Sequence, residues 1–142
     1  NGMSALKVTV ADAKAPLAKS VVRKLAHLLT VAGRLRKREI ESVGIAFVAE
    51  PIMRELNTRY RKHRFVTDVL SFTYQARPLV GELIICRGQA ARQAKRQKHT
   101  LTRELLVLAA HGYLHLMGLD HMKPSERKHM RQVEQQLLSE IG

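Results

Sequence analysis

The feature that most constrains the fold is a helical segment that is apolar on every side. Residues 105–110 read LLVLAA, and a helix that is hydrophobic all round has to be buried on all its faces. Thr100 or Thr102 can cap the start of this helix with a side-chain oxygen, and Gly118 can end it. The chain therefore predicts a central helix that other elements must enclose.

The segments around this helix show both strand and helix patterns. A chain of 142 residues is expected to form one domain, residues 1–142. Apolar periodicity predicts strands at 4–11, 43–49, 69–74 and 79–86, and helices at 17–32, 51–60, 88–98 and from 124 onward. Gly33 is expected to stop the first helix, so residues 34–38 form a loop or short turn. This order predicts an α/β (α+β) fold, with a small mixed sheet of about four strands covered by helices.

The charge balance indicates an anionic partner. Lys and Arg number 25 and Asp and Glu number 12, so the net charge is +13. This excess favours nucleic acid, bound through its phosphates; an anionic membrane surface and simple solubility are the alternatives. The basic residues gather at 34–38, 59–64 and 87–103, which predicts a broad basic surface.

Other features narrow the class of protein. No apolar stretch approaches the roughly 18 residues of a membrane span, and the first ten residues, in which Met3 could be the natural start, show no signal segment. Cys86 is the single cysteine, which excludes an internal disulfide and suits a reducing, cytosolic compartment. Aromatic residues make up 4% of the chain, so nucleic-acid recognition should depend on phosphates more than on base stacking.

Three histidines in and after the central helix have the spacing of a metal site. His111 and His115 are four residues apart, which places both rings on one helix face. Gly118 permits a left-handed turn that can bring His121 back as a third ligand. Three neutral imidazoles with one open position are typical of catalytic zinc. Three ordinary histidines are the alternative, disfavoured because unpaired imidazoles in a Leu-rich core would cost roughly several kcal/mol. The remaining histidines are expected to be surface or loop residues: His27, His63, His99 and His129.

The same spacing occurs in the metzincin zinc proteases. In those proteases the residue after the first histidine is the Glu that serves as general base, whereas here it is Gly112. Glu104 precedes His111 by seven residues, about 10 Å along a helix, which is too far to replace that base. We interpret Glu104 as a structural residue or one that supports a ligand.

The run HGYLHLMGLDH at 111–121 resembles the histidine signature of the YbeY family, bacterial endoribonucleases of rRNA maturation. Residues 56–61 (LNTRYR) and 67–72 (TDVLSF) are similar to the family's second hallmark segment, and the resemblance extends over about 43–142. It departs at Val66, where the family usually has proline, and at Glu82, where Asp is expected. The resemblance implies a compact α/β domain with a mixed sheet, acting on ribosomal RNA in the cytosol.

The resemblance also implies roles for particular residues. One zinc ion, or nickel or another divalent metal, is held by His111, His115 and His121, and the family's essential arginine falls on Arg61. Zinc can lower the pKa of a bound water to about 7, and the arginine fork matches two oxygens of the scissile phosphate. Attack by water and attack by the RNA's own 2′-OH both remain open. Asp120 either orients a ligand or caps the turn.

Further basic residues are expected to contact RNA, with a solvated helix face as the alternative for those on helices. They are Arg59, Lys62, Arg64, Arg92, Lys95 and Arg96. The expected partners are ribosomal RNA, single-stranded or structured, and the small ribosomal subunit, without DNA or membrane. Three functions are compared: a metal-dependent endoribonuclease, a ribosome-assembly factor whose zinc is only structural, and a metalloprotease, which Gly112 and the basic surface disfavour.

Overall fold

A computed structural model describes residues 5–10, 17–61, 69–119 and 123–141 of the chain. The elements alternate as the sequence predicts, with boundaries that differ by a few residues. In chain order they are β1 (Leu6–Val10), α2 (Lys19–Arg36), β2 (Ile40–Val48), α3 (Glu50–Arg61), β3 (Val69–Gln75), β4 (Leu79–Cys86), α4 (Arg87–Gln97), α5 (Leu101–Leu116) and α6 (Pro124–Ile141).

The strands form one mixed sheet in the order β1-β2-β4-β3. The pairs β1–β2 and β2–β4 are parallel, whereas β3 and β4 form an antiparallel hairpin. Parallel neighbours require crossover connections, which the helices between them supply. The expected α/β fold with a four-stranded mixed sheet is confirmed, and β3 is one of the edges of that sheet.

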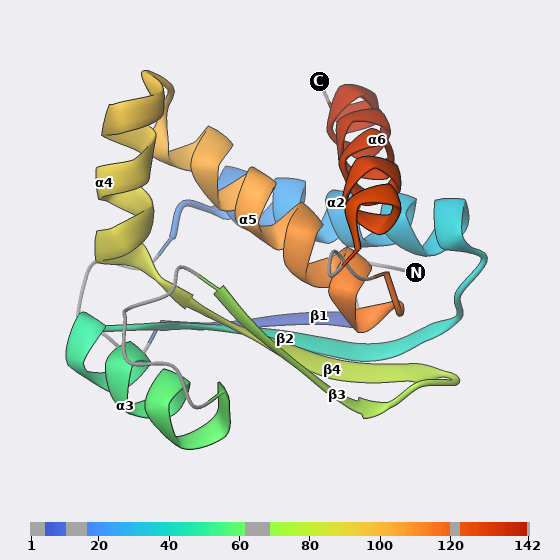
Figure 1. The fold of residues 1–142 in the computed structure, drawn as a ribbon, viewed down its shortest axis with the longest axis horizontal. Coiled ribbons are helices and arrows are strands. Elements are labelled where there is room, and N and C mark those ends of the chain that lie inside the picture. The colour runs from blue at the N-terminus through green and yellow to red at the C-terminus, as the bar shows by residue number, and fades with distance from the viewer. Residues whose placement is uncertain (1–4, 11–16, 62–68, 120–122, 142) are drawn as a thin grey trace.

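Helices cover both faces of the sheet, which Figure 1 shows from the side. Side chains alternate along β4: Leu83 and Ile85 belong to the main core, whereas Ile84 and Cys86 pack with Met53 of α3 in a smaller cluster. Because successive strand residues point to opposite faces, α3 lies on one face, and α2, α4, α5 and α6 lie on the other (Figure 1).

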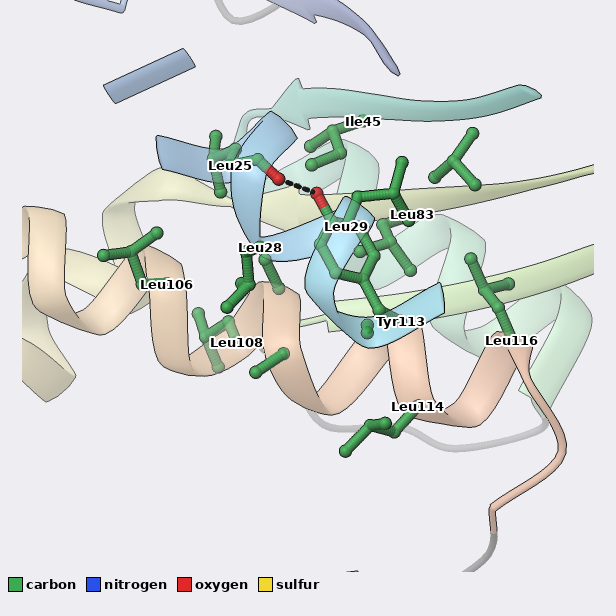
Figure 2. Packing of buried hydrophobic residues seen from close by; sticks show 14 of the residues in the cluster. Leu25, Leu28, Leu29, Ile45, Leu83, Leu106, Leu108, Tyr113, Leu114 and Leu116 are labelled. Carbon is green, nitrogen blue, oxygen red and sulfur yellow. Dashed lines mark hydrogen bonds between the residues drawn. The ribbon is translucent and has the colours of Figure 1, made fainter. Parts of the chain in front are cut away.

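Helix α5 is the central helix that the apolar segment predicts. Its N-terminus is capped by the Thr100 hydroxyl, which accepts the Arg103 N–H at 3.0 Å. Fully buried Tyr113 donates its hydroxyl to the Leu25 carbonyl of α2 at 2.9 Å (Figure 2). Burial raises the pKa of the Tyr113 phenol, so the hydroxyl stays protonated and can donate. Figure 2 shows leucines of α2 and α5 gathered around this bond.

The prediction that Gly33 ends the first helix is wrong. Gly33 lies inside α2, and the helix continues to Arg36, with Lys37 as a left-handed cap at φ 54°. A Cβ at Gly33 would lie 2.7 Å from Ile40 Cδ1. The absence of a side chain at Gly33 therefore leaves room for Ile40, the first residue of β2, to pack against α2. Residues 34–36, with Arg34 and Arg36, therefore form the last helical turn instead of a loop. Tertiary packing outweighs the low helix propensity of one glycine, about 1 kcal/mol.

Among the described helices, none is long and apolar enough to cross a membrane.

Candidate functional site

His111 and His115 lie side by side near the C-terminal end of α5. Their ring centroids are 4.7 Å apart and the ring planes are inclined at 71°. Both residues are partly exposed, between a helix face buried in the core and the surface. The structure thus brings together two of the three histidines that the sequence predicts as metal ligands.

A carboxylate from another helix supports the first histidine. Glu134 of α6 lies with Oε1 2.6 Å from His111 Nδ1, and its side chain is 17% exposed. A histidine that binds a metal through one ring nitrogen commonly donates the other N–H to a carboxylate, which orients the ring and raises its basicity. The Glu134 contact would therefore direct Nε2 of His111 toward a metal.

The third expected ligand, His121, and its neighbour Asp120 lie outside the described residues. Within the described ranges, which include His111 and His115, no group of three or more His, Cys, Asp or Glu side chains could hold a metal. The turn that leads toward His121 is described. Gly118 has φ +93°, which a side chain would disfavour, and its N–H donates to the His115 carbonyl at 3.0 Å.

An arginine that precedes β2 holds this turn. Arg38, two residues before β2, donates from Nη2 to the Met117 carbonyl at 3.0 Å and from Nη1 to the Ala76 carbonyl at 3.3 Å. These bonds join the C-terminal end of α5 to the β3–β4 hairpin. Thr73 of β3 also donates to the Leu116 carbonyl at 3.5 Å. The segment after His115 therefore leaves α5 from an anchored position.

Gly112 faces the sheet, away from open space. A Cβ at this position would lie 2.7 Å from Leu83 Cδ2, and Leu83 is fully buried. A Glu here, as in the metzincin proteases, would have to displace the core packing on β4. The position has no room for a protease base, which agrees with the interpretation of the sequence.

Arg61 is the last residue of α3, one residue beyond the helix expected at 51–60; its side chain lies outside what the structure describes. Two contacts bring α3 and α5 to the same edge strand. Tyr60 packs edge-on against Phe72 of β3 with ring centroids 5.7 Å apart, and Thr73 bonds the end of α5. Although α3 and α5 cover opposite faces of the sheet, β3 lies between the end of α3 and the histidine helix.

The described basic residues that are expected to contact RNA lie on two helices, α3 and α4. Arg59 on α3 pairs with Glu55 at 2.9 Å on the exposed surface. Arg92 on α4 pairs with Glu50 at the start of α3, and the hydrogen bond between them lowers the pKa of Glu50 and raises that of Arg92. Lys95 and Arg96 are exposed on α4. Lys62 and Arg64 lie outside the described residues.

Two contacts around α5 were not predicted from the sequence. Glu134 was not assigned a role, because apolar periodicity marked only the helix expected from residue 124 onward and not its polar residues. His99 was expected to be an ordinary loop residue. Its Nε2 lies 2.6 Å from Oε1 of buried Glu104. Of the two roles expected for Glu104, this contact favours the structural one.

The fold and the paired histidines define an α/β domain with a candidate histidine metal centre on its central helix. A protein-family model described as endoribonuclease YbeY matches residues 7–142. An endoribonuclease YbeY of Finegoldia magna is 41% identical over 105 residues, which cover 70% of this chain and 69% of that protein. One of Desulforamulus reducens is 40% identical over 110 residues, covering 70% and 72%.

A solved structure shares the fold. The solution structure of TM1509 from Thermotoga maritima matches with a TM-score of 0.67 and 24% identity, covering 96% of this chain and 88% of that one. The chain belongs to the YbeY family of endoribonucleases, enzymes that hydrolyse RNA.

Proposed function

We propose that this chain is a zinc-dependent endoribonuclease of rRNA maturation, with His111, His115 and His121 as metal ligands and Arg61 at the scissile phosphate. Membership of the YbeY family supports the reaction class. The observation that carries the metal centre is the histidine pair whose first member bonds Glu134 at 2.6 Å. Instead of zinc, another divalent metal such as nickel would suit the same nitrogen donors.

The donor set fits zinc. Neutral imidazoles are common zinc ligands, and three of them leave one coordination position open for water or substrate. When bound, zinc supplies a Lewis acid that acidifies water and stabilises negative charge on phosphate oxygens. Glu134 would keep the His111 ring in one tautomer and orientation. Asp120, beside His121, would orient that ligand in the same way.

Arg61 would position the phosphate. Its guanidinium presents two parallel N–H donors to two phosphate oxygens, and it would stabilise the charge that develops as the phosphorus centre becomes five-coordinate. The nucleophile is either water or the adjacent 2′-OH of the RNA. The second route yields a 2′,3′-cyclic phosphate and the first does not, so the product end group distinguishes them.

The net charge of +13 supports binding to RNA through its phosphates. We propose that Arg59, Lys62, Arg64, Arg92, Lys95 and Arg96 contribute to this surface, and that the substrate is ribosomal RNA of the small subunit, in the cytoplasm. Arg92 would have to exchange its contact with Glu50 for a phosphate.

Cleavage of a defined single-stranded RNA by zinc-loaded protein tests this function. We expect Arg61→Ala and His115→Ala to abolish cleavage, with Arg61→Ala still folded and zinc-bound. Arg54→Ala is the matched control, because it removes an exposed arginine of the same helix that is not assigned to the RNA surface, and it should retain most of the activity.

Two other results would contradict the proposal. Cleavage that survives in both Arg61→Ala and His115→Ala would come from a contaminating nuclease. Salt-sensitive RNA binding without any cleavage, by protein that keeps its zinc, would instead indicate a ribosome-assembly factor in which the metal is structural.

A further inference from the structure

A pocket of about 280 Å³ lies beside His111, where α5 meets α6. It is lined by His111 of α5 and by four residues of α6: Arg127, Met130, Arg131 and Glu134. A water molecule occupies about 30 Å³ of liquid, so the pocket can hold a phosphate group with part of its sugar. His111, a candidate metal ligand, forms one wall of this pocket.

The four lining residues of α6 form one helical stripe. Their spacing of three, one and three residues places them on the face that meets α5. Met130 is 1% exposed and packs into the main core, so it fixes that face of the helix. Glu134 contacts His111, and both arginines lie at exposed positions toward the N-terminal end of α6. The stripe thus runs from the metal centre outward to two cations.

The charges of the pocket favour an anion. Arg127 and Arg131 carry two positive charges, and the carboxylate of Glu134 is engaged with His111 Nδ1. Guanidinium groups match the oxygens of a phosphate in a bidentate way. Because the two arginines are four residues apart on one helix, both can reach a single group or two consecutive ones.

The basic cluster on α4 lies further from the histidines. Helix α5 begins at Leu101, just after α4, and His111 is ten residues further along, about 15 Å at 1.5 Å per residue. Figure 1 shows α4 and α6 at opposite ends of the helical layer. Cations of α4 would therefore bind distant parts of a substrate, whereas those of α6 border the metal centre.

We propose that Arg127 and Arg131 form a phosphate subsite that holds the RNA backbone next to the scissile linkage, so that the strand lies along the surface where α5 and α6 meet. This inference rests on the proposed function, because it assumes that cleavage occurs at His111 and His115. It assigns substrate positioning to the last helix, for which the sequence predicted only helical structure.

Binding of a single-stranded RNA oligonucleotide, followed by fluorescence anisotropy at several salt concentrations, tests the subsite. The variant is Arg127→Gln/Arg131→Gln in the full chain. The control, Lys24→Gln/Lys128→Gln, removes the same charge from exposed positions outside the pocket. Each lost phosphate contact changes the slope of log K against log salt by about 0.7 for single strands. We expect a slope less negative by about 1.4 and an affinity about 25-fold lower at roughly 0.1 M salt in the variant.

The control should bind like the wild-type protein, and both double variants should keep their melting temperature and zinc content. Equal slopes for Arg127→Gln/Arg131→Gln and its control would overturn the subsite. A scan with one neutral methylphosphonate at a time locates the contact: one position should weaken wild-type binding and leave the arginine variant unchanged. Absence of such a position would also overturn the proposal.

The two proposals fail separately. If zinc-loaded wild-type protein binds the RNA without cutting it, the nuclease proposal fails, and the comparison of binding slopes still decides the subsite. If the wild-type protein cuts the RNA and the arginine variant both binds and cuts like its control, the subsite fails and the nuclease proposal stands.

Discussion

Replacing Gly112 with alanine sets two opposing effects against each other within the histidine helix. Alanine in place of glycine in a helix interior stabilises by about 1 kcal/mol. The new methyl group, however, would lie 2.7 and 2.8 Å from the two methyl carbons of Leu83. Leu83 is fully buried in the main core, so its methyl groups can retreat only by displacing other side chains.

Overpacking of this kind costs about 1–3 kcal/mol. The steric cost should exceed the gain in helix propensity, which leaves Gly112→Ala about 1 kcal/mol less stable than the wild-type protein. For a domain of this size, that corresponds to a melting temperature lower by about 2–4 °C. Urea unfolding followed by circular dichroism would show a lower midpoint at an unchanged slope.

A double-mutant cycle with Leu83 tests the physical reason. Leu83→Ala alone should cost about 2–5 kcal/mol. In that background the two Leu83 methyl groups that Gly112→Ala would meet are absent, so the substitution should stabilise by up to about 1 kcal/mol, a coupling of about 2 kcal/mol. Stabilisation by Gly112→Ala in the wild-type background would refute the reasoning, because it would mean that the Leu83 side chain can move aside at little cost in free energy.

Other substitutions test the contacts around α5. Tyr113→Phe removes the donor to the Leu25 carbonyl and should cost about 1 kcal/mol in urea unfolding; an unchanged midpoint would show that this bond adds nothing. Gly118→Ala places a side chain at φ +93° and should cost about 1–2 kcal/mol, with full stability as the contrary result. Glu134→Gln should lower zinc affinity about 10–100-fold in equilibrium dialysis, and affinity within twofold of wild type would contradict the support of His111 by Glu134.

Features that depend on local periodicity could be predicted from the sequence. The apolar run at 105–110 predicts the central helix, and the four-residue interval predicts that His111 and His115 share a face, as their 4.7 Å ring separation confirms. The left-handed residue at Gly118 was also expected. These properties hold because helical geometry relates residues three or four apart, whatever surrounds them.

Contacts between distant segments could not be predicted in this way. Gly33 reads locally as a helix stop, yet α2 continues because Ile40 of the next strand fills the space beside it. Arg38 anchors the turn after α5, 79 residues away in sequence. No periodicity relates such positions, so their roles depend on the strand order.

The candidate site itself combines both kinds of information. The sequence alone determined the histidine pair, the absence of a carboxylate at Gly112 and the excess of positive charge. Only the tertiary structure placed Glu134, 23 residues along the chain, against His111 and set Arg127 and Arg131 beside the same ring. The spacing of residues within one helix is a local property. Which helix packs against the histidine helix depends on the packing of the whole core, in which α5 and α6 bury their apolar faces together.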